Sequence, residues 1–157
     1  MLQLQDKASA FILASDDDGK ALFVREWGAA EWKALLAHTA EIELPSGETL
    51  LRQGESGRTL YFVATGAVRV SVVYGDQALG LLREVLPGSV LGEVAFFDAG
   101  PRTAKVWAVE DSTLLRLNFE DYQKFAAANP QRSTELLFAL GALVARRLRD
   151  ILMRAKV

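Results

Sequence analysis

Short apolar runs separated by glycine- and proline-containing turns fill the middle of the chain, from Ile42 to Leu117, and constrain the fold most. The runs are Thr49–Leu51, Leu60–Val63, Val68–Val73, Leu79–Leu82, Val90–Leu91 and Thr113–Leu117. The turn signals between them lie at 45–47, 54–57, 65–66, 74–76, 87–88 and 99–101. Many short strands joined by such turns predict a mainly β fold, a β-roll of the jelly-roll type.

Helical patterns flank this strand region on both sides. Residues 28–38 carry apolar side chains at helical spacing and few β-branched residues, which predicts an N-terminal helix. Phe119 to Ala128 predicts a short helix, and Asn129-Pro130 then restarts the chain in a helix that reaches about Lys156. At 1.5 Å per residue this last helix is roughly 40 Å long, more than one small roll covers.

An apolar stripe runs along the long C-terminal helix. Leu137, Val144 and Ile151 repeat every seven residues, and Leu140 and Leu148 lie on the same side. We expect this stripe to pair with a second copy of the chain, which predicts a homodimer. The C-terminal half of the helix is expected to act also as a lid.

The chain divides into three predicted parts. Residues 1–26 form an N-terminal extension, read either as a hairpin around Asp16-Asp17-Asp18-Gly19 or as a disordered arm. Residues 27–128 form the β-roll with its flanking helices, and 129–157 form the long helix used for dimerisation or as a lid.

Composition excludes several kinds of chemistry. Among 157 residues there is no cysteine and only one histidine, His38. A zinc or iron site built from several imidazoles or thiolates is therefore excluded, and a Ser-His-Asp set would need His38 itself. We expect no catalytic residue, no metal and no cofactor, and hence a binding protein instead of an enzyme.

Charge and hydropathy indicate the compartment and the partners. The formal charge is −2, which gives no general attraction to nucleic acid. No apolar run has the length of a membrane span, and the N-terminus lacks the pattern of a signal peptide. The sequence thus predicts a cytoplasmic protein without a membrane partner.

The stretch from Pro87 to Ala104 carries the most specific chemistry. Gly92 permits a close backbone approach, and Val94 to Asp98 can form a short helical turn whose free N–H groups suit an anion. Arg102 follows a turn and offers a planar fork that matches two phosphate oxygens. Glu93 is an acceptor beside this anion site, which suits a ribose hydroxyl.

This stretch resembles the phosphate-binding cassette of cyclic-nucleotide-binding domains, which are found in catabolite activator proteins, kinase regulatory subunits and nucleotide-gated channels. The family pattern is Gly-Glu, a short apolar helix, then Pro-Arg, a small residue and alanine; here it is Gly92-Glu93 and Pro101-Arg102-Thr103-Ala104. Matching segments elsewhere are 45–48, 53–55, 60–63, 66–68 and 129–148, so the resemblance covers roughly residues 27–153.

The resemblance implies a role for each residue of the site. Glu93 would accept from the ribose 2′-hydroxyl, and Arg102 would pair with the cyclic phosphate, assisted by N–H groups of the cassette. Val70, Leu82 and the lid residues Ile151 or Leu152 would cover the base. The expected ligand-binding residues are Val70, Leu82, Gly92, Glu93, Val94, Ala95, Arg102, Thr103, Ala104 and Ile151.

Two departures from the family pattern affect base recognition and output. Where the activators place a hydroxyl residue against adenine, this chain has Ile151 and Leu152, so stacking or an arginine, Arg149 or Arg154, is expected instead. The activators continue into a helix-turn-helix, whereas this sequence stops after the long helix. Sequence-specific DNA binding is therefore not expected, and the signal would pass to an effector protein not identified by the sequence.

The function expected from these observations is that of a cyclic-nucleotide sensor, with cyclic AMP as the favoured ligand. Thr103 leaves cyclic GMP open, because in the kinases a threonine at this place reaches the exocyclic amine of guanine. The alternatives are a cyclic-GMP-selective sensor and a structural dimerisation module that has lost its ligand.

Overall fold

The computed structural model describes residues 3–14, 20–74, 77–78 and 83–154. Its helices are α1 (Leu4–Ile12), α2 (Ala29–Leu36), α3 (Glu93–Asp98), α4 (Phe119–Ala128) and α5 (Pro130–Arg154). Its strands are β1 (Ala40–Leu44), β2 (Thr49–Leu51), β3 (Leu60–Thr65), β4 (Val68–Ser71), β5 (Val73–Tyr74), β6 (Gln77–Ala78), β7 (Arg83–Val85), β8 (Val90–Leu91), β9 (Lys105–Ala108) and β10 (Ser112–Leu117).

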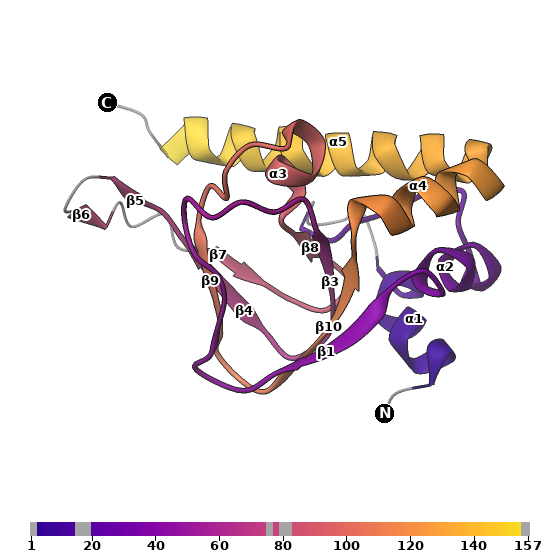
Figure 1. Cartoon of the computed structure of the whole chain (residues 1–157), viewed down its shortest axis with the longest axis horizontal. Coiled ribbons are helices and arrows are strands. Elements are labelled where there is room, and N and C mark those ends of the chain that lie inside the picture. Colours follow the sequence, from indigo (N-terminus) through magenta and orange to yellow (C-terminus); the bar gives the residue numbers. More distant parts are fainter. Residues whose placement is uncertain (1–2, 15–19, 75–76, 79–82, 155–157) are drawn as a thin grey trace.

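The strands form the β-roll that the sequence predicts. One antiparallel sheet has the order β1-β10-β3-β8, a second has the order β2-β9-β4-β7, and β5 and β6 form a separate hairpin. In Figure 1 the helices α1, α2 and α4 gather at one end of the roll, while α5 runs along one side of it. The long C-terminal helix thus lies over the roll as one of its walls.

Strand β3 explains why the molecule has two cores. Successive side chains of a strand point to opposite faces, and both faces of β3 are covered. Leu60, Phe62 and Ala64 pack into the cluster shared with the helices. Val63 packs into the cluster between the two sheets, with Tyr61 against it. The continuous apolar run in this strand is therefore the pattern of a strand buried on both sides.

The N-terminal extension contains a helix, whereas the sequence predicts either a hairpin or a disordered arm. The apolar run that begins at Ala10 continues α1, whose Ala8 and Phe11 are buried in the helical core. Phe11 also stacks against Trp32 of α2, with ring centroids 5.0 Å apart. The hairpin reading of this run is wrong because these buried side chains recur at helical spacing. The Asp16–Gly19 turn lies outside the described residues.

Helix α5 does not use the apolar stripe predicted from its heptads. Leu136, Leu140 and Leu143 are buried against the roll, so Leu140 belongs to the core of its own chain. Phe138, Leu148 and Leu152 instead remain 78%, 54% and 61% exposed. The predicted stripe lies between these two faces, because the seven-residue repeat does not distinguish two apolar faces that sit side by side on a helix.

No helix in the described ranges combines the length and the hydrophobicity of a membrane-spanning segment.

The fold predicts that the first half of α5 is part of the structural core. Leu140→Ala should lower the free energy of unfolding by about 2–5 kcal/mol, because it removes a fully buried side chain and leaves a cavity. Leu86→Ala, at a position 51% exposed, is the control and should change it by less than about 0.5 kcal/mol. Urea denaturation measures both. Equal, small effects would show that α5 is not packed against the roll.

Candidate functional site

The turn between β8 and α3 brings the backbone of the cassette, residues 87–104, against its neighbours. Gly92 has φ of 84°, in the left-handed region. A Cβ added there would lie 2.7 Å from the carbonyl oxygen of Thr59 and 2.9 Å from Nη1 of Arg102. Only glycine fits this place without a shift of backbone, and it starts α3 with Glu93 as its first residue.

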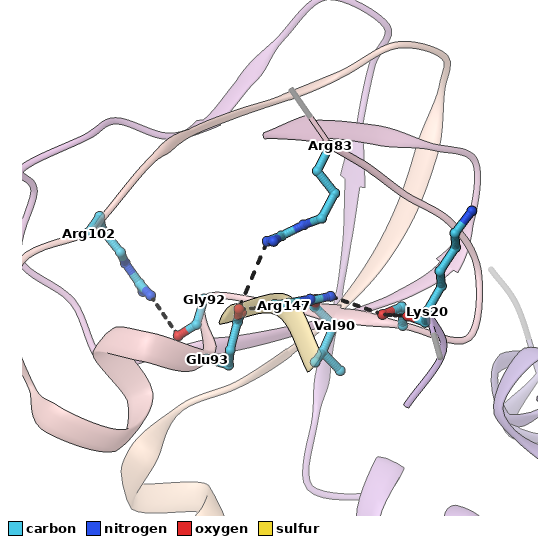
Figure 2. Close-up of polar contacts among 8 residues, drawn as sticks. Lys20, Arg83, Val90, Gly92, Glu93, Arg102 and Arg147 are labelled. Carbon is cyan, nitrogen blue, oxygen red and sulfur yellow. Dashed lines mark hydrogen bonds and ion pairs between the residues drawn. The ribbon is translucent and has the colours of Figure 1, made fainter. Parts of the chain in front are cut away.

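Two arginines from distant parts of the chain converge on the Glu93 carboxylate. Glu93 is only 6% exposed. Its Oε1 lies 2.7 Å from Nη1 of Arg147, on α5, and 4.0 Å from Nη2 of Arg83, at the start of β7. Figure 2 shows both guanidinium groups pointing toward the carboxylate. A buried carboxylate needs such partners, since an unpaired buried charge is costly.

The same Arg147 side chain ties α5 to the edge of the roll. Its Nη2 donates to the carbonyl of Val90, on β8, at 2.7 Å and to the hydroxyl of Ser89 at 3.1 Å. The Ser89 hydroxyl in turn donates to the carbonyl of Lys20 at 2.8 Å. Arg147 therefore connects the long helix, strand β8 and the carboxylate of the cassette through one guanidinium group (Figure 2).

Arg102 is held from the other side, mainly through its backbone. Its N–H donates to the carbonyl of Glu55 at 2.8 Å, and its carbonyl accepts from the N–H of Gly54 at 2.8 Å. The side chain is 5% exposed, and its Nη1 donates to the carbonyl of Gly92 at 3.3 Å. Burial lowers the pKa of Arg102 because desolvation disfavours the charged form.

A pocket with excess positive charge lies between these groups. Arg83, Arg102 and Glu93 line it, with about 360 Å³ of space when its open mouth is included. Desolvation, assisted by repulsion from Arg147, lowers the pKa of Arg83 to about 10, while Glu93 acts in the opposite direction. Arg83 still carries its charge at neutral pH, so this pocket suits an anion.

The remaining walls of the pocket are apolar and come from both sheets. They include Leu51, Val70, Leu91 and Val106, from β2, β4, β8 and β9. These walls favour a ligand with an anionic end and an apolar body.

The structure brings together most of the predicted ligand-binding residues. Those that line the pocket are Val70, Gly92, Glu93, Val94, Ala95, Arg102, Thr103 and Ala104. Leu82 lies outside the described residues. All of these residues except Val70 belong to the cassette, so their proximity in the pocket follows from their proximity in the sequence.

The lid expected from Ile151 or Leu152 is not found over the pocket. Neither residue lines it, and Ile151 is 39% exposed. Ile151 lies about one helical turn beyond Arg147 on the same face of α5, but at this end of the helix the side chains that line the hollow beside β7 are Asp150 and Arg154. Arg149 and Arg154, the other expected base contacts, are exposed as well. The group that α5 presents to the cassette is Arg147.

Arg83 and Arg147 are the site residues that the sequence reading missed. For Arg147 a signal existed, since it falls on the same helical face as the buried Leu136, Leu140 and Leu143. An arginine that continues a buried face indicates a buried partner. Arg83 gave no signal, because a single arginine in a short strand is ordinary.

Arg83 stands at the border between this pocket and a larger hollow. The hollow lies between β7 and α5, and its lining includes Arg147, Asp150 and Arg154. Within the part of the chain that the structure describes, no three histidine, cysteine or acidic side chains gather as metal ligands would.

Comparisons with known proteins identify the family of the chain. The family model described as "Cyclic nucleotide-binding domain" matches residues 41–129. The chain is 39% identical over 109 residues to the Cyclic AMP receptor protein of Thermus thermophilus, covering 68% of this chain and 47% of that protein. It is 30% identical over 116 residues to the CRP-like cAMP-activated global transcriptional regulator of Mycobacterium tuberculosis, covering 74% of this chain and 50% of the regulator.

Solved structures give the same relationship. The Thermus thermophilus catabolite activator protein superposes with a TM-score of 0.71 at 32% identity, covering 83% of this chain and 59% of its own. A cyclic nucleotide-binding domain from Methylobacillus flagellatus superposes with a TM-score of 0.78 over 97% of this chain and 82% of its own, and at 19% identity it supports the fold alone. The chain spans about half the length of the curated relatives named here.

The family match extends over more than half of the chain and includes Glu93 and Arg102 in their buried positions. This chain therefore belongs to the cyclic nucleotide-binding domain family.

Proposed function

We propose that this chain is a sensor that binds a cyclic nucleotide in the pocket and reports it through α5. The observation that carries the proposal is the pair of buried, oppositely charged residues in one pocket, Arg102 and Glu93, each held by the chain before any ligand arrives. An anion suits Arg102 and a hydroxyl donor suits Glu93. A cyclic nucleotide carries these two groups on one rigid ring system.

The phosphate is proposed to lie between Arg102 and the start of α3. Arg102 presents a fork of N–H donors, which matches the oxygens of a phosphate. Within the described part of the chain its side chain donates to one backbone carbonyl, at 3.3 Å, a long hydrogen bond that a phosphate would readily replace.

The ribose is proposed to bind Glu93, which already has Arg147 as its partner. A carboxylate has lone pairs for several donors, so a ribose hydroxyl and Arg147 can share it. The Arg147 contact would then change in length or direction when ligand binds. Since Arg147 lies on α5, this shared carboxylate connects the occupancy of the pocket to the placement of the helix.

We favour cyclic AMP as the ligand, because the relatives that match at 30% and 39% identity are described as a cAMP-activated regulator and a cyclic AMP receptor. Both descriptions also support a binding role instead of a catalytic one. The downstream partner is proposed to be a protein that contacts α5.

Cyclic GMP is a second candidate, favoured by Arg83. A guanidinium group pairs well with O6 and N7 of guanine and less well with adenine, which places an amino group beside N7. Arg83 lines both the pocket and the hollow under α5. Its buried Nε has no hydrogen-bond partner among the residues that the structure describes. A base that extends from the ribose toward this hollow would supply one.

A second copy of the chain is proposed to cover the outward face of α5. Phe138, Leu148 and Leu152 are exposed there at related helical positions, and exposed apolar side chains in such a row mark an interaction surface. Gly141, with no atom near the position of a Cβ, would permit close approach of a second helix.

Calorimetric titration with cyclic AMP tests the two polar ends of the pocket. Arg102→Ala should weaken binding by about 2–4 kcal/mol, because it removes a buried, charge-assisted partner of the phosphate. Glu93→Ala should cost less and should abolish the preference for cyclic AMP over its 2′-deoxy analogue. Arg52→Ala, at an exposed arginine of the same region, is the control and should bind as the wild type does.

Unchanged titrations for both Arg102→Ala and Glu93→Ala would contradict the proposed site. A wild-type protein that binds neither nucleotide would favour the alternative reading, a structural module of the same fold.

Base selection is tested with three ligands and two variants. Cyclic IMP has the O6 and N7 of guanine but lacks its 2-amino group. Arg83→Gln should therefore weaken cyclic GMP and cyclic IMP together, roughly tenfold, relative to cyclic AMP. Thr103→Ala should weaken cyclic GMP alone, if its hydroxyl contacts the amino group. Equal losses for all three ligands would show that neither side chain reads the base.

Light scattering over a range of concentrations tests the α5 surface. The wild type should dimerise, and Leu148→Glu should shift it to monomer, because a charge is costly within an apolar interface. Gln123→Glu makes the same charge change at an exposed position of α4, outside this face of α5, and should leave the dimer intact. A wild type that is monomeric at every concentration would refute the dimer.

A further inference from the structure

The loop from Arg52 to Thr59, called here the 52–59 loop, borders the pocket on the side of Arg102. Its backbone makes the two hydrogen bonds, from Gly54 and Glu55, that hold the Arg102 backbone. Gly57 also approaches the guanidinium, since a Cβ added there would lie 3.1 Å from Nη2 of Arg102. This loop therefore fixes one wall of the pocket.

Arg58 extends from the same loop to the far end of α3, the opposite wall. Its Nε donates to the carbonyl of Phe96 at 2.8 Å, and its Nη2 donates to the carbonyl of Phe97 at 3.2 Å. The last carbonyls of a helix have no partner within the helix, and a cation at this end is favoured by the helix dipole. Helix α3 has only six residues, so Phe96 and Phe97 lie in its last turn.

Arg58 also contacts the first residue of α4. Its guanidinium carbon lies 3.6 Å from the centroid of the Phe119 ring. The ring of Phe119 packs edge-on against Phe96, with centroids 5.7 Å apart. The next residue of the loop, Thr59, donates its hydroxyl to Oδ1 of Asn118 at 3.3 Å. The 52–59 loop is thus bound to both α3 and the start of α4.

We infer that Arg58 is a positioning residue for nucleotide binding, which sets the separation between α3 and Arg102. This inference rests on the proposed function of the pocket. Arg58 does not line the pocket, so its effect on a ligand must pass through the helix that it holds. Because one loop anchors Arg102 by its backbone and α3 by the Arg58 side chain, the two walls have a common support.

Loss of the Arg58 guanidinium group releases α3 from the 52–59 loop, while the backbone of that loop still holds Arg102. The phosphate would then keep its arginine and lose the alignment of the α3 amides. Both hydrogen bonds are charge-assisted, and Phe119 shields the guanidinium face from water, so the contact is stronger than that of an exposed arginine.

Hydrogen exchange tests this inference without any ligand. The N–H of Phe96 donates to the carbonyl of Gly92, and that of Ala99 to the carbonyl of Ala95, so both report on α3. In Arg58→Met these amides should exchange at least several-fold faster than in the wild type, while those of β3 stay unchanged. Arg52→Met removes an exposed guanidinium from the same loop and should leave α3 unchanged.

Calorimetric titration then tests the consequence for binding. Arg58→Met should bind cyclic AMP about tenfold more weakly, and Arg52→Met should match the wild type. The two phosphorothioate diastereomers of cyclic AMP give a further readout, because sulfur replaces one or the other exocyclic oxygen. If α3 and Arg102 face different oxygens, Arg58→Met changes the ratio of the two affinities, which a general loss of stability would not change.

Arg58→Lys keeps the charge and loses the planar fork, and should fall between Arg58→Met and the wild type in both measurements. If Arg58→Met does not fold, Arg58→Lys takes its place in both measurements. Unchanged α3 exchange in both variants would overturn the inference, as would wild-type affinity with an unaltered diastereomer ratio. A wild type that binds no cyclic nucleotide would refute the proposed function, whereas the exchange result would still decide whether Arg58 holds α3.

Discussion

The contact between Arg147 and Glu93 is the constraint on which the rest of the site depends. Strands β7 and β8 are the outer strands of different sheets, so the roll is open between them. Arg147 lies at this opening and bonds both to Val90 of β8 and to the first residue of α3. A buried ion pair contributes little net stability, but breaking it by removing one partner is costly. The pair therefore fixes where α5 lies more than it adds to stability.

The same ion pair links the proposed nucleotide site to the position of the long helix. A ligand shifts an equilibrium only by its difference in affinity between two arrangements. In the proposed binding mode Glu93 supplies such a difference, because its donors would include both a ligand hydroxyl and the Arg147 guanidinium. A phosphate at Arg102 would contact no α5 residue that lines the pocket, so affinity and helix placement would depend on different ends of the pocket.

The parts of the site that the sequence predicted are those that are close together in the chain. Glu93 and Arg102 belong to one segment with a specific order of residues, and the roll is signalled by many short strands. The partner of Glu93 comes from a helix far along the chain, and no local pattern pairs them. The stripe on α5 was misplaced for a related reason, since Leu140 faces the core of its own chain while Leu148 faces outward. A heptad repeat identifies the apolar positions of a helix but does not indicate whether each one packs against its own chain or against a partner.

The backbone hydrogen bonds that hold Arg102 determine which positions of the 52–59 loop tolerate substitution. Glu55 contributes a carbonyl oxygen to the site, and its side chain is directed elsewhere, toward Arg52. Many residue types at position 55 would supply the same carbonyl, so the hydrogen bond to the Arg102 N–H survives substitution there, and only the coulombic effect of the Glu55 carboxylate on the pKa of Arg102 is lost. Gly57 has no such latitude, because any added side chain meets the guanidinium of Arg102. Across diverging descendants of this chain, Gly57 would persist while Glu55 is replaced.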